Sequence, residues 1–310
     1  IRSEGGNPKS NMHKFKSVPL LNDFIRDHYE PYVKARKKSW SLDIGMLKMH
    51  VIPCMGHIPM NKIRNSDVHN FVQSLLINNY AKTTCNRLLI LIKHVFNCAI
   101  RFEIIKANVN PFKEIKALPV QLRERHLQPH ELKSLLTELK RNRNTMVTNI
   151  VLLLLYTGAR KREILDARWN EIDLENKIIW IPPERSKSGK PRPVALSNPA
   201  VELIRNLHRD ENIPYLFFNE KTNKPPVSIF SAWNTIRKNA GLNDFRLHDL
   251  RHSFASFLVN AGHSLYEVQR LLGHQDPKVT MRYSHLSQGM LVGAANHAAS
   301  IIDSARKDMN

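Results

Sequence analysis

Cysteine is scarce in this sequence of 310 residues, and the three that occur form no CxxC pair. Cys54, Cys85 and Cys98 therefore indicate neither a disulfide framework nor a zinc site, and we interpret them as buried thiols in a reducing cytosol. Long apolar runs are also absent, since the longest, from Ile150 to Tyr156, is too short to cross a bilayer. We therefore expect a cytoplasmic protein with no membrane segment.

Acidic residues are also in short supply. The chain has 27 Asp and Glu against 47 Lys and Arg, which gives a formal net charge of +20 that is spread along its whole length. An excess of this size predicts a polyanionic partner, and nucleic acid is the natural one. A basic protein without a specific ligand is the alternative that the composition leaves open.

The chain is long for a single core, so two compact domains joined by a linker are expected. Residues 1–16 are polar and basic without an apolar period, and we interpret them as a flexible lead. Residues 17–107 carry apolar side chains at helical spacing, which predicts a domain of four helices. Residues 108–126 hold Pro111 and Pro119 and no sustained apolar period, which predicts an extended linker.

The remaining part, residues 127–310, is expected to form a second domain of mixed structure. Two strand-like runs, residues 178–181 and 192–196, flank a turn-forming stretch at 186–191 and predict an antiparallel hairpin. Helical periodicity predicts helices near residues 129–141, 144–156, 160–167, 199–209, 227–239, 248–261, 264–272, 276–285 and 289–305. The expected fold class is therefore mainly α with a small antiparallel β-sheet.

Basic residues are concentrated at the helix ends and loops of the first domain. Ordinary solvated charge is one interpretation. So many cations on one small helical domain favour the other, a face that follows the phosphates of DNA. The candidates for such contacts are Lys37, Lys38, Lys82 and Arg87.

Several polar residues of the second domain occur in an order typical of one chemistry. They are Arg160 in TGARKRE, Lys187 in SKSGK, His248 and Arg251 in HDLRH, His274 in LLGHQ and Tyr283 in MRYSH. Each motif alone has a structural interpretation, such as a capped helix start or a solvated turn. Taken together in this order, they resemble the tyrosine recombinase or phage integrase family, and residues 17–107 look like that family's core-binding domain. Ala159 stands where Leu is common in the family, and no catalytic position is missing.

The resemblance implies that four of these residues bind a scissile phosphodiester. Arg160 and Arg251 would hold the phosphate oxygens, because a planar guanidinium can fork onto two of them and keeps its charge. His248 would donate to the phosphate or accept the tyrosine proton, since imidazole titrates near neutral pH. His274 would donate a hydrogen bond to the same phosphate.

The other two residues would carry out the bond changes. Tyr283 would attack the phosphorus and conserve the bond energy in a 3′-phosphotyrosine. Lys187 would protonate the leaving 5′ oxygen as general acid, although Lys190 on the same turn could exchange roles with it. The resemblance implies neither a cofactor nor a metal.

Further residues are implied as supports and contacts. Glu163 would support the Arg160 site as a hydrogen-bond acceptor. Backbone contacts that position DNA without reading its sequence are expected from Lys161, Arg162, Lys190, Arg192, Arg246 and His252.

The partners implied by the resemblance are double-stranded DNA attachment sites and further copies of the chain. We expect a tetramer on two paired sites, a Holliday junction between rounds of cleavage, and exchange of the C-terminal helix between subunits. Accessory DNA-bending or directionality proteins would assist. The protein would be encoded by a bacterium or a phage and act on the nucleoid for integration or excision of a mobile element, and residues 1–16 would be the remnant of an N-terminal arm-binding domain.

Two other functions are compatible with the same residues. A type IB topoisomerase uses a similar set but relaxes supercoils as a monomer, and a non-catalytic DNA-binding regulator would retain the motif without using it. The short spacing from LLGH to Tyr283 and the expected exchangeable tail favour a recombinase.

Overall fold

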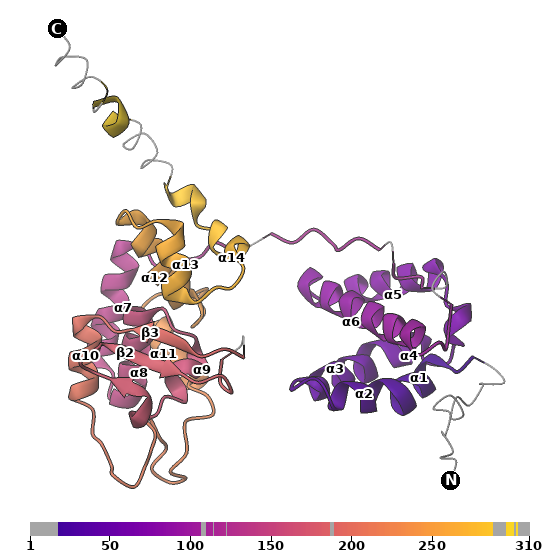
Figure 1. The fold of residues 1–310 in the computed structure, drawn as a ribbon, viewed down its shortest axis with the longest axis horizontal. Helices are drawn as coiled ribbons and strands as arrows, with labels where there is room; N and C mark the ends of the chain where they lie inside the picture. Colours follow the sequence, from indigo (N-terminus) through magenta and orange to yellow (C-terminus); the bar gives the residue numbers. More distant parts are fainter. Residues whose placement is uncertain are drawn as a thin grey trace, which may run out of the picture. The chain divides into compact units, whose positions relative to one another are not determined.

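The computed structural model describes residues 18–106, 110–113, 115–121, 123–186, 189–287, 296–300 and 302. The chain divides into two compact parts, the N-terminal unit Ile1–Leu122 and the C-terminal unit Arg123–Asn310 (Figure 1). The lead predicted over residues 1–16 lies outside the described residues.

Four helical stretches make up most of the described part of the N-terminal unit, the number that the sequence predicts. The first two, residues 21–34 and 40–55, each contain a π-helical turn in the middle. The elements are α1 (Leu21–Phe24), η1 (Ile25–Tyr29), α2 (Glu30–Lys34), α3 (Trp40–Met46), η2 (Leu47–Val51), α4 (Ile52–Met55), the 3₁₀ turn η3 (Met60–Lys62), α5 (Asn65–Ile77) and α6 (Lys82–Arg101).

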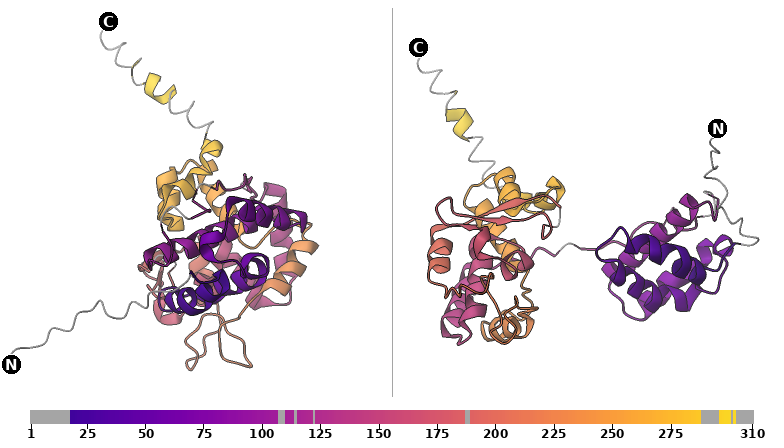
Figure 2. Two further views of the ribbon diagram at one scale, coloured as in Figure 1. Left: turned by 90° about the vertical axis from the view of Figure 1, so that its right-hand side faces the viewer. Right: turned by 60° about the horizontal axis from the view of Figure 1, so that its bottom comes forward.

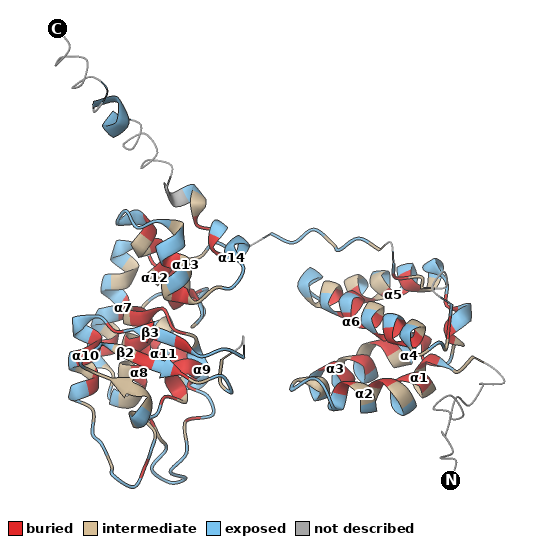
Figure 3. Cartoon of the chain, in the orientation of Figure 1, coloured by how far each residue is buried: buried red, intermediate tan, exposed pale blue. Residues whose placement is uncertain are grey.

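The apolar faces of these helices meet in one core (Figure 3). Leu21 and Phe24 of α1 are fully buried, and so are Leu88, Ile92 and Val95 of α6. Because α6 is 20 residues long, its apolar face reaches η1, η2 and α5. Full burial of one such side chain is worth about 1.5–3 kcal/mol, so packing rather than helix propensity holds this unit together.

The C-terminal unit is also mainly helical, and its helices begin near the predicted positions. They are α7 (Pro129–Arg141), α8 (Thr145–Thr157), α9 (Lys161–Leu165), the 3₁₀ turn η5 (Trp169–Glu171), α10 (Asn198–Arg205), α11 (Phe230–Asn239), α12 (Asp249–Asn260), α13 (Leu265–Leu272), α14 (Pro277–Met281) and the 3₁₀ turn η6 (Ser284–Ser287). The helix predicted over 276–285 is divided, so that Tyr283 lies in the turn between α14 and η6.

The predicted hairpin is confirmed, and a third short strand extends it. The sheet has the order β1 (Ile172–Asp173), β2 (Ile178–Ile181), β3 (Arg192–Ala195), with antiparallel pairing throughout. Side chains alternate, since Ile179 and Ile181 are buried while Trp180 is 49% exposed. The right-hand view of Figure 2 shows the hairpin beside the C-terminal helices, in agreement with the contact between β3 and α13.

Helix α8 is the centre of the larger core. It packs against α10 and α12, and Ile150, Val151 and Leu153 are fully buried. It ends at Gly158, whose φ of 59° is left-handed and favours glycine. In the described part of the chain, no helix has the length and apolar composition needed to cross a membrane.

The ends of the predicted linker bind to the unit next to them. The backbone nitrogen of Leu118 donates to Oδ1 of Asn86 at 2.7 Å, within the N-terminal unit. In the C-terminal unit, the guanidinium of Arg125 donates to Glu131 at 2.8 Å. Of the helix predicted over 289–305, residues 296–300 and 302 are described and helical, and the rest lies outside the described residues.

Candidate active site

The Arg160 side chain is fixed at the start of a helix. After the left-handed turn at Gly158, Arg160 caps α9, and Glu163 one turn later closes the cap. Oε2 of Glu163 accepts from the Arg160 backbone nitrogen at 2.8 Å, and Oε1 accepts from Nη1 at 2.9 Å. Glu163 is 3% exposed, whereas the Arg160 side chain is 29% exposed and can still meet a ligand.

Arg251, on the first turn of α12, is held by two backbone carbonyls. Its Nη1 donates to the carbonyl of Gly158 and its Nη2 to the carbonyl of Leu272, both at 2.6 Å. Burial, together with the positive charges of Arg160 and Arg192, lowers its pKa to about 9. Arg251 is therefore still protonated at neutral pH.

The end of α13 places His274 near Arg160 and Arg251. Gly273 ends this helix with a left-handed φ of 62°, and its carbonyl accepts from Nη2 of Arg160 at 3.3 Å. Nδ1 of His274 lies 2.9 Å from the hydroxyl of Thr280. Burial, followed by the charges of Arg251 and Arg160, lowers the pKa of His274 to about 3, so the ring is neutral at physiological pH.

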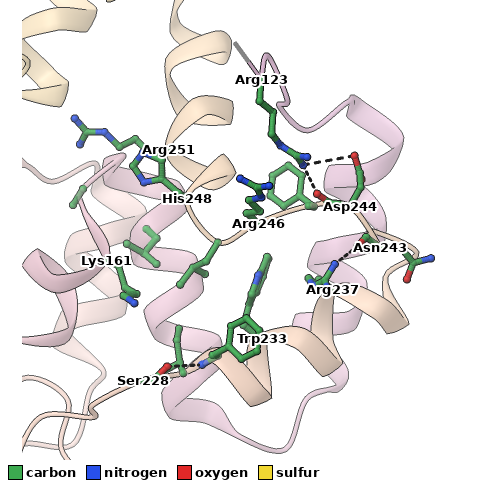
Figure 4. A pocket seen from close by; sticks show the side chains of 16 residues that line it. Arg123, Lys161, Ser228, Trp233, Arg237, Asn243, Asp244, Arg246, His248 and Arg251 are labelled. Atoms are coloured by element: carbon green, nitrogen blue, oxygen red, sulfur yellow. Dashed lines mark hydrogen bonds and ion pairs between the residues drawn. The ribbon is translucent and has the colours of Figure 1, made fainter. Parts of the chain in front are cut away.

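His248 lies at the edge of a neighbouring cavity of about 680 Å³ (Figure 4). Basic side chains contribute to the lining, among them Arg123, Lys161, Arg237 and Arg246, and Arg251 borders the same space. The protein atoms packed around the His248 ring, and next the charge of Arg251, lower its pKa, although the residue remains accessible to solvent. Because these basic side chains outnumber the one carboxylate in the lining, Asp244, the cavity is an electropositive recess, which Arg251 borders.

Tyr283 is buried, with an exposed fraction of 5%. Its ring packs in a small core between α12 and α13 that includes Ala255, Val259 and Leu272. The hydroxyl lies 2.5 Å from Nδ1 of His252. Burial raises the pKa of Tyr283, because the phenolate is poorly solvated there.

The turn of the hairpin is described in part. Lys187, the residue expected to act as general acid, lies outside the described residues. Lys190, which could exchange roles with it, is described and exposed.

The candidate DNA contacts in the C-terminal unit fall into two groups. Lys161, Lys190 and Arg246 are exposed, as a phosphate contact requires. Arg162 is exposed as well, but its guanidinium donates to Asp166 and to the carbonyls of Pro226 and Val227. The side chains of Arg192 and His252 are also bonded inside the unit, to the Leu272 carbonyl and to Tyr283.

In the N-terminal unit, Lys38, Lys82 and Arg87 are exposed. Lys37 forms an ion pair with Asp43, a carboxylate that is 5% exposed, so part of its role is structural. Within the described residues, no group of three or more His, Cys, Asp or Glu is arranged to hold a metal ion.

Two protein-family models match this chain. The model of the phage integrase family matches residues 125–290, and that of the phage integrase N-terminal SAM-like domain matches residues 20–76. The chain belongs to the phage integrase family. The matched 125–290 segment contains Arg160, His248, Arg251, His274 and Tyr283, together with the turn that carries Lys187.

Individual relatives give the extent of the likeness. The integrase of Salmonella phage P22 is 32% identical over 203 residues, which cover 62% of this chain and 51% of that protein, so the match spans about half of its relative. A solved Tn1549 transposon integrase in complex with circular intermediate DNA has a TM-score of 0.70 at 17% identity, over 85% of this chain and 94% of that one. A lambda integrase tetramer bound to a Holliday junction has a TM-score of 0.68 at 16% identity, over 86% and 78%.

Sequence reasoning missed two contacts of the site. His252 was expected to contact DNA. Its position four residues after His248 places both side chains on one face of a helix, and this spacing could have indicated that His252 belongs to the site. Arg192 was also expected on DNA, but it is 8% exposed and its guanidinium lies against the end of α13. Alternation along β3 predicts an inward side chain there, since Val194 two residues later is fully buried.

Proposed function

We propose that this protein is a site-specific DNA recombinase that cleaves and rejoins strands through a 3′-phosphotyrosine bond at Tyr283. The observation that carries the proposal is the pair of guanidiniums held by neighbouring backbone carbonyls, Arg160 by the carbonyl of residue 273 and Arg251 by those of residues 158 and 272. Two guanidiniums fixed by backbone acceptors form a preorganised anion site, and a phosphodiester fits it. The family membership supports the same activity.

In this reaction Arg160 and Arg251 stabilise the negative charge that develops on the non-bridging oxygens as the phosphorus becomes five-coordinate. His248 and His274 donate hydrogen bonds to the same phosphate. The oxygen of Tyr283 forms a bond to phosphorus while the bond from phosphorus to the 5′ oxygen breaks.

The leaving 5′ oxygen takes its proton from the ammonium group of Lys187 or, in the alternative, of Lys190. Attack by the 5′ hydroxyl of a second strand reverses these steps and releases the tyrosine. No metal or other cofactor takes part in this scheme. Lys161, Lys190 and Arg246 contact the DNA backbone, as do Lys38, Lys82 and Arg87 of the N-terminal unit.

The partners in this proposal are double-stranded attachment sites and three further copies of the chain. The lambda integrase tetramer on a Holliday junction supports such an assembly. The C-terminal helix is exchanged between subunits, and accessory DNA-bending proteins assist the reaction. The reaction takes place in the cytoplasm and integrates or excises a mobile element. The proposed division assigns core-site binding to residues 17–107, and it assigns catalysis to the domain expected over 127–310, extended at its start to Arg123, where the C-terminal unit begins.

The direct test is covalent trapping on nicked suicide duplexes that carry candidate attachment sites. Wild type should form an adduct that survives a denaturing gel, and Tyr283→Phe should form none while binding the duplex as tightly. Tyr266→Phe is the matched control, because Tyr266 is in the same unit and 64% exposed. An adduct that persists in Tyr283→Phe would show that another residue is the nucleophile.

The two alternative functions give different results. A topoisomerase relaxes a supercoiled plasmid that lacks any attachment site, whereas a recombinase leaves it supercoiled. A regulator binds DNA and forms no adduct on any duplex.

A further inference from the structure

The nucleophile has a partner that the proposed mechanism does not use. The hydroxyl of Tyr283 lies 2.5 Å from Nδ1 of His252, within hydrogen-bond distance. Tyr283 is in the turn after α14 and His252 is on α12, so the contact joins segments 31 residues apart. Tyr283 is 5% exposed, and His252 is partly buried.

The surroundings keep this imidazole neutral. Burial is the main cause that lowers the pKa of His252 to about 4, and the positive charge of Arg282 acts in the same direction. Further groups that act on the ring are His248 and Arg251, which lower the pKa, and Asp249, which raises it. At neutral pH a neutral imidazole therefore faces a protonated phenol.

His248 and His252 divide the same helix face between two tasks. They are four residues apart, and their rings stand nearly perpendicular with centroids 5.1 Å apart. His248 borders the electropositive cavity together with Arg251, whereas His252 contacts the tyrosine. One histidine therefore lies toward the proposed phosphate site and the other toward the nucleophile.

We propose that His252 is the positioning residue of the nucleophile: its Nδ1 accepts the Tyr283 hydroxyl proton and so turns the lone pairs of the phenolic oxygen toward the phosphorus. The inference rests on the proposed function, since it assigns a role within that reaction. A phenol has one proton, and fixing its direction fixes the orientation of the lone pairs that attack.

The proton then has a defined path during cleavage. As the Tyr283 oxygen bonds to phosphorus, its proton moves to Nδ1 of His252, while the leaving 5′ oxygen takes a proton from the lysine ammonium. The negative charge of the bound phosphodiester favours the imidazolium that forms. On religation the 5′ hydroxyl gives its proton to the lysine amine, and the imidazolium returns its proton to the released phenolate.

The contact itself is testable without DNA. In ¹⁵N-histidine NMR of the full chain at pH 7, His252, assigned from its loss in His252→Asn, should be the neutral tautomer with the proton on Nε2. Its Nδ1 resonance should shift in Tyr283→Phe, which removes the hydroxyl and keeps the ring. A resonance that is the same in both proteins, or a tautomer with the proton on Nδ1, overturns the proposal whatever the protein does with DNA.

The role in cleavage is tested by single-turnover adduct formation on the suicide duplex. His252→Phe keeps an aromatic ring and removes the acceptor, so cleavage should slow by about 10²-fold, the scale of one proton-transfer contact. His252→Asn places an oxygen near the position of Nδ1 and should recover most of the loss. The dissociation constant for the duplex should be unchanged in both variants.

The matched control is His285→Phe, because His285 lines the same small recess beside Tyr283 and is exposed. It should cleave at the wild-type rate. Wild-type cleavage by His252→Phe, or no recovery in His252→Asn, overturns the positioning role and leaves the recombinase proposal intact. If wild type forms no adduct on any duplex, the proposed function fails, and with it the role in catalysis, whether or not the NMR contact is found.

Discussion

Glu163 holds Arg160 at two points: Oε1 accepts from Nη1 at 2.9 Å, and Oε2 accepts from the backbone nitrogen at 2.8 Å. Oε2 also lies 3.6 Å from Nη2 of Arg192. Because Glu163 is 3% exposed, water screens its charge little, and it offsets part of the repulsion among the clustered guanidiniums.

Replacing Glu163 by Gln should therefore destabilise the C-terminal unit by about 3 kcal/mol, because guanidiniums are left close together without a carboxylate. Urea unfolding measures this change. Inorganic phosphate should stabilise the variant more than the wild type, since a bound anion replaces the lost charge. Glu171→Gln, which removes the partner of Arg185 in the same unit, is the control and should gain no such extra stability. A Glu163→Gln protein with wild-type stability would contradict this account of the cluster.

A second prediction concerns Gly273, which ends α13 beside the cluster. A Cβ there would overlap the guanidinium of Arg192, with Cζ at 2.8 Å, and the left-handed φ of 62° would be strained by about 1–2 kcal/mol in addition. Gly273→Ala should therefore lose stability and, by displacing the carbonyl that Arg160 contacts, slow adduct formation.

Gly241→Ala is the matched control for Gly273→Ala. Gly241 has a left-handed φ of 75°, but nothing lies within 4 Å of a Cβ at this position. It should show the backbone cost alone, with normal cleavage. Equal losses in the two variants would mean that the contact with Arg192 adds nothing.

The order of motifs was enough to predict which helices meet at the site, but not how their side chains pair. The helix that starts directly after Arg160 and the one that starts two residues before Arg251 follow from local periodicity and from Gly158, which are short-range properties. The pairing of Tyr283 with His252 depends instead on how α12 and the turn after α14 pack, which no local pattern encodes. Arg192 is a different case, because its formal charge suggested the surface, whereas the alternation along β3 is a local pattern that places its side chain inside.

Acid should destabilise the C-terminal unit through its buried histidines. The pKa of His252 is lowered from 6.5 to about 4, so between these values the unfolded chain takes up a proton that the folded chain does not. This contribution to stability is complete above pH 6.5 and is lost as pH falls toward 4, with a slope of at most about 1.4 kcal/mol per pH unit for one proton. The free energy of unfolding, measured in urea from pH 7.5 to 4.5, should fall less steeply in His252→Asn than in wild type. His285→Asn, at an exposed position, should keep the wild-type slope, and parallel curves for all three proteins would contradict the assignment.

The boundary of the C-terminal unit gives the last prediction, since residues 123–126 make contacts within this unit although the sequence assigns them to a linker. Nη2 of Arg123 lies 3.1 Å from the carboxylate of Asp249, which is 4% exposed, and its carbonyl accepts from Nη2 of Arg282 at 2.8 Å. A fragment that begins at Leu127 removes both contacts and leaves the buried Asp249 charge without its cation. This fragment should therefore be less stable than one that begins at Arg123, by at least about 2 kcal/mol in urea unfolding. The Arg123 fragment carrying Arg123→Ala separates the side chain from the backbone and should fall between the two. If both fragments unfold at the same urea concentration, residues 123–126 are a linker, as the sequence suggests.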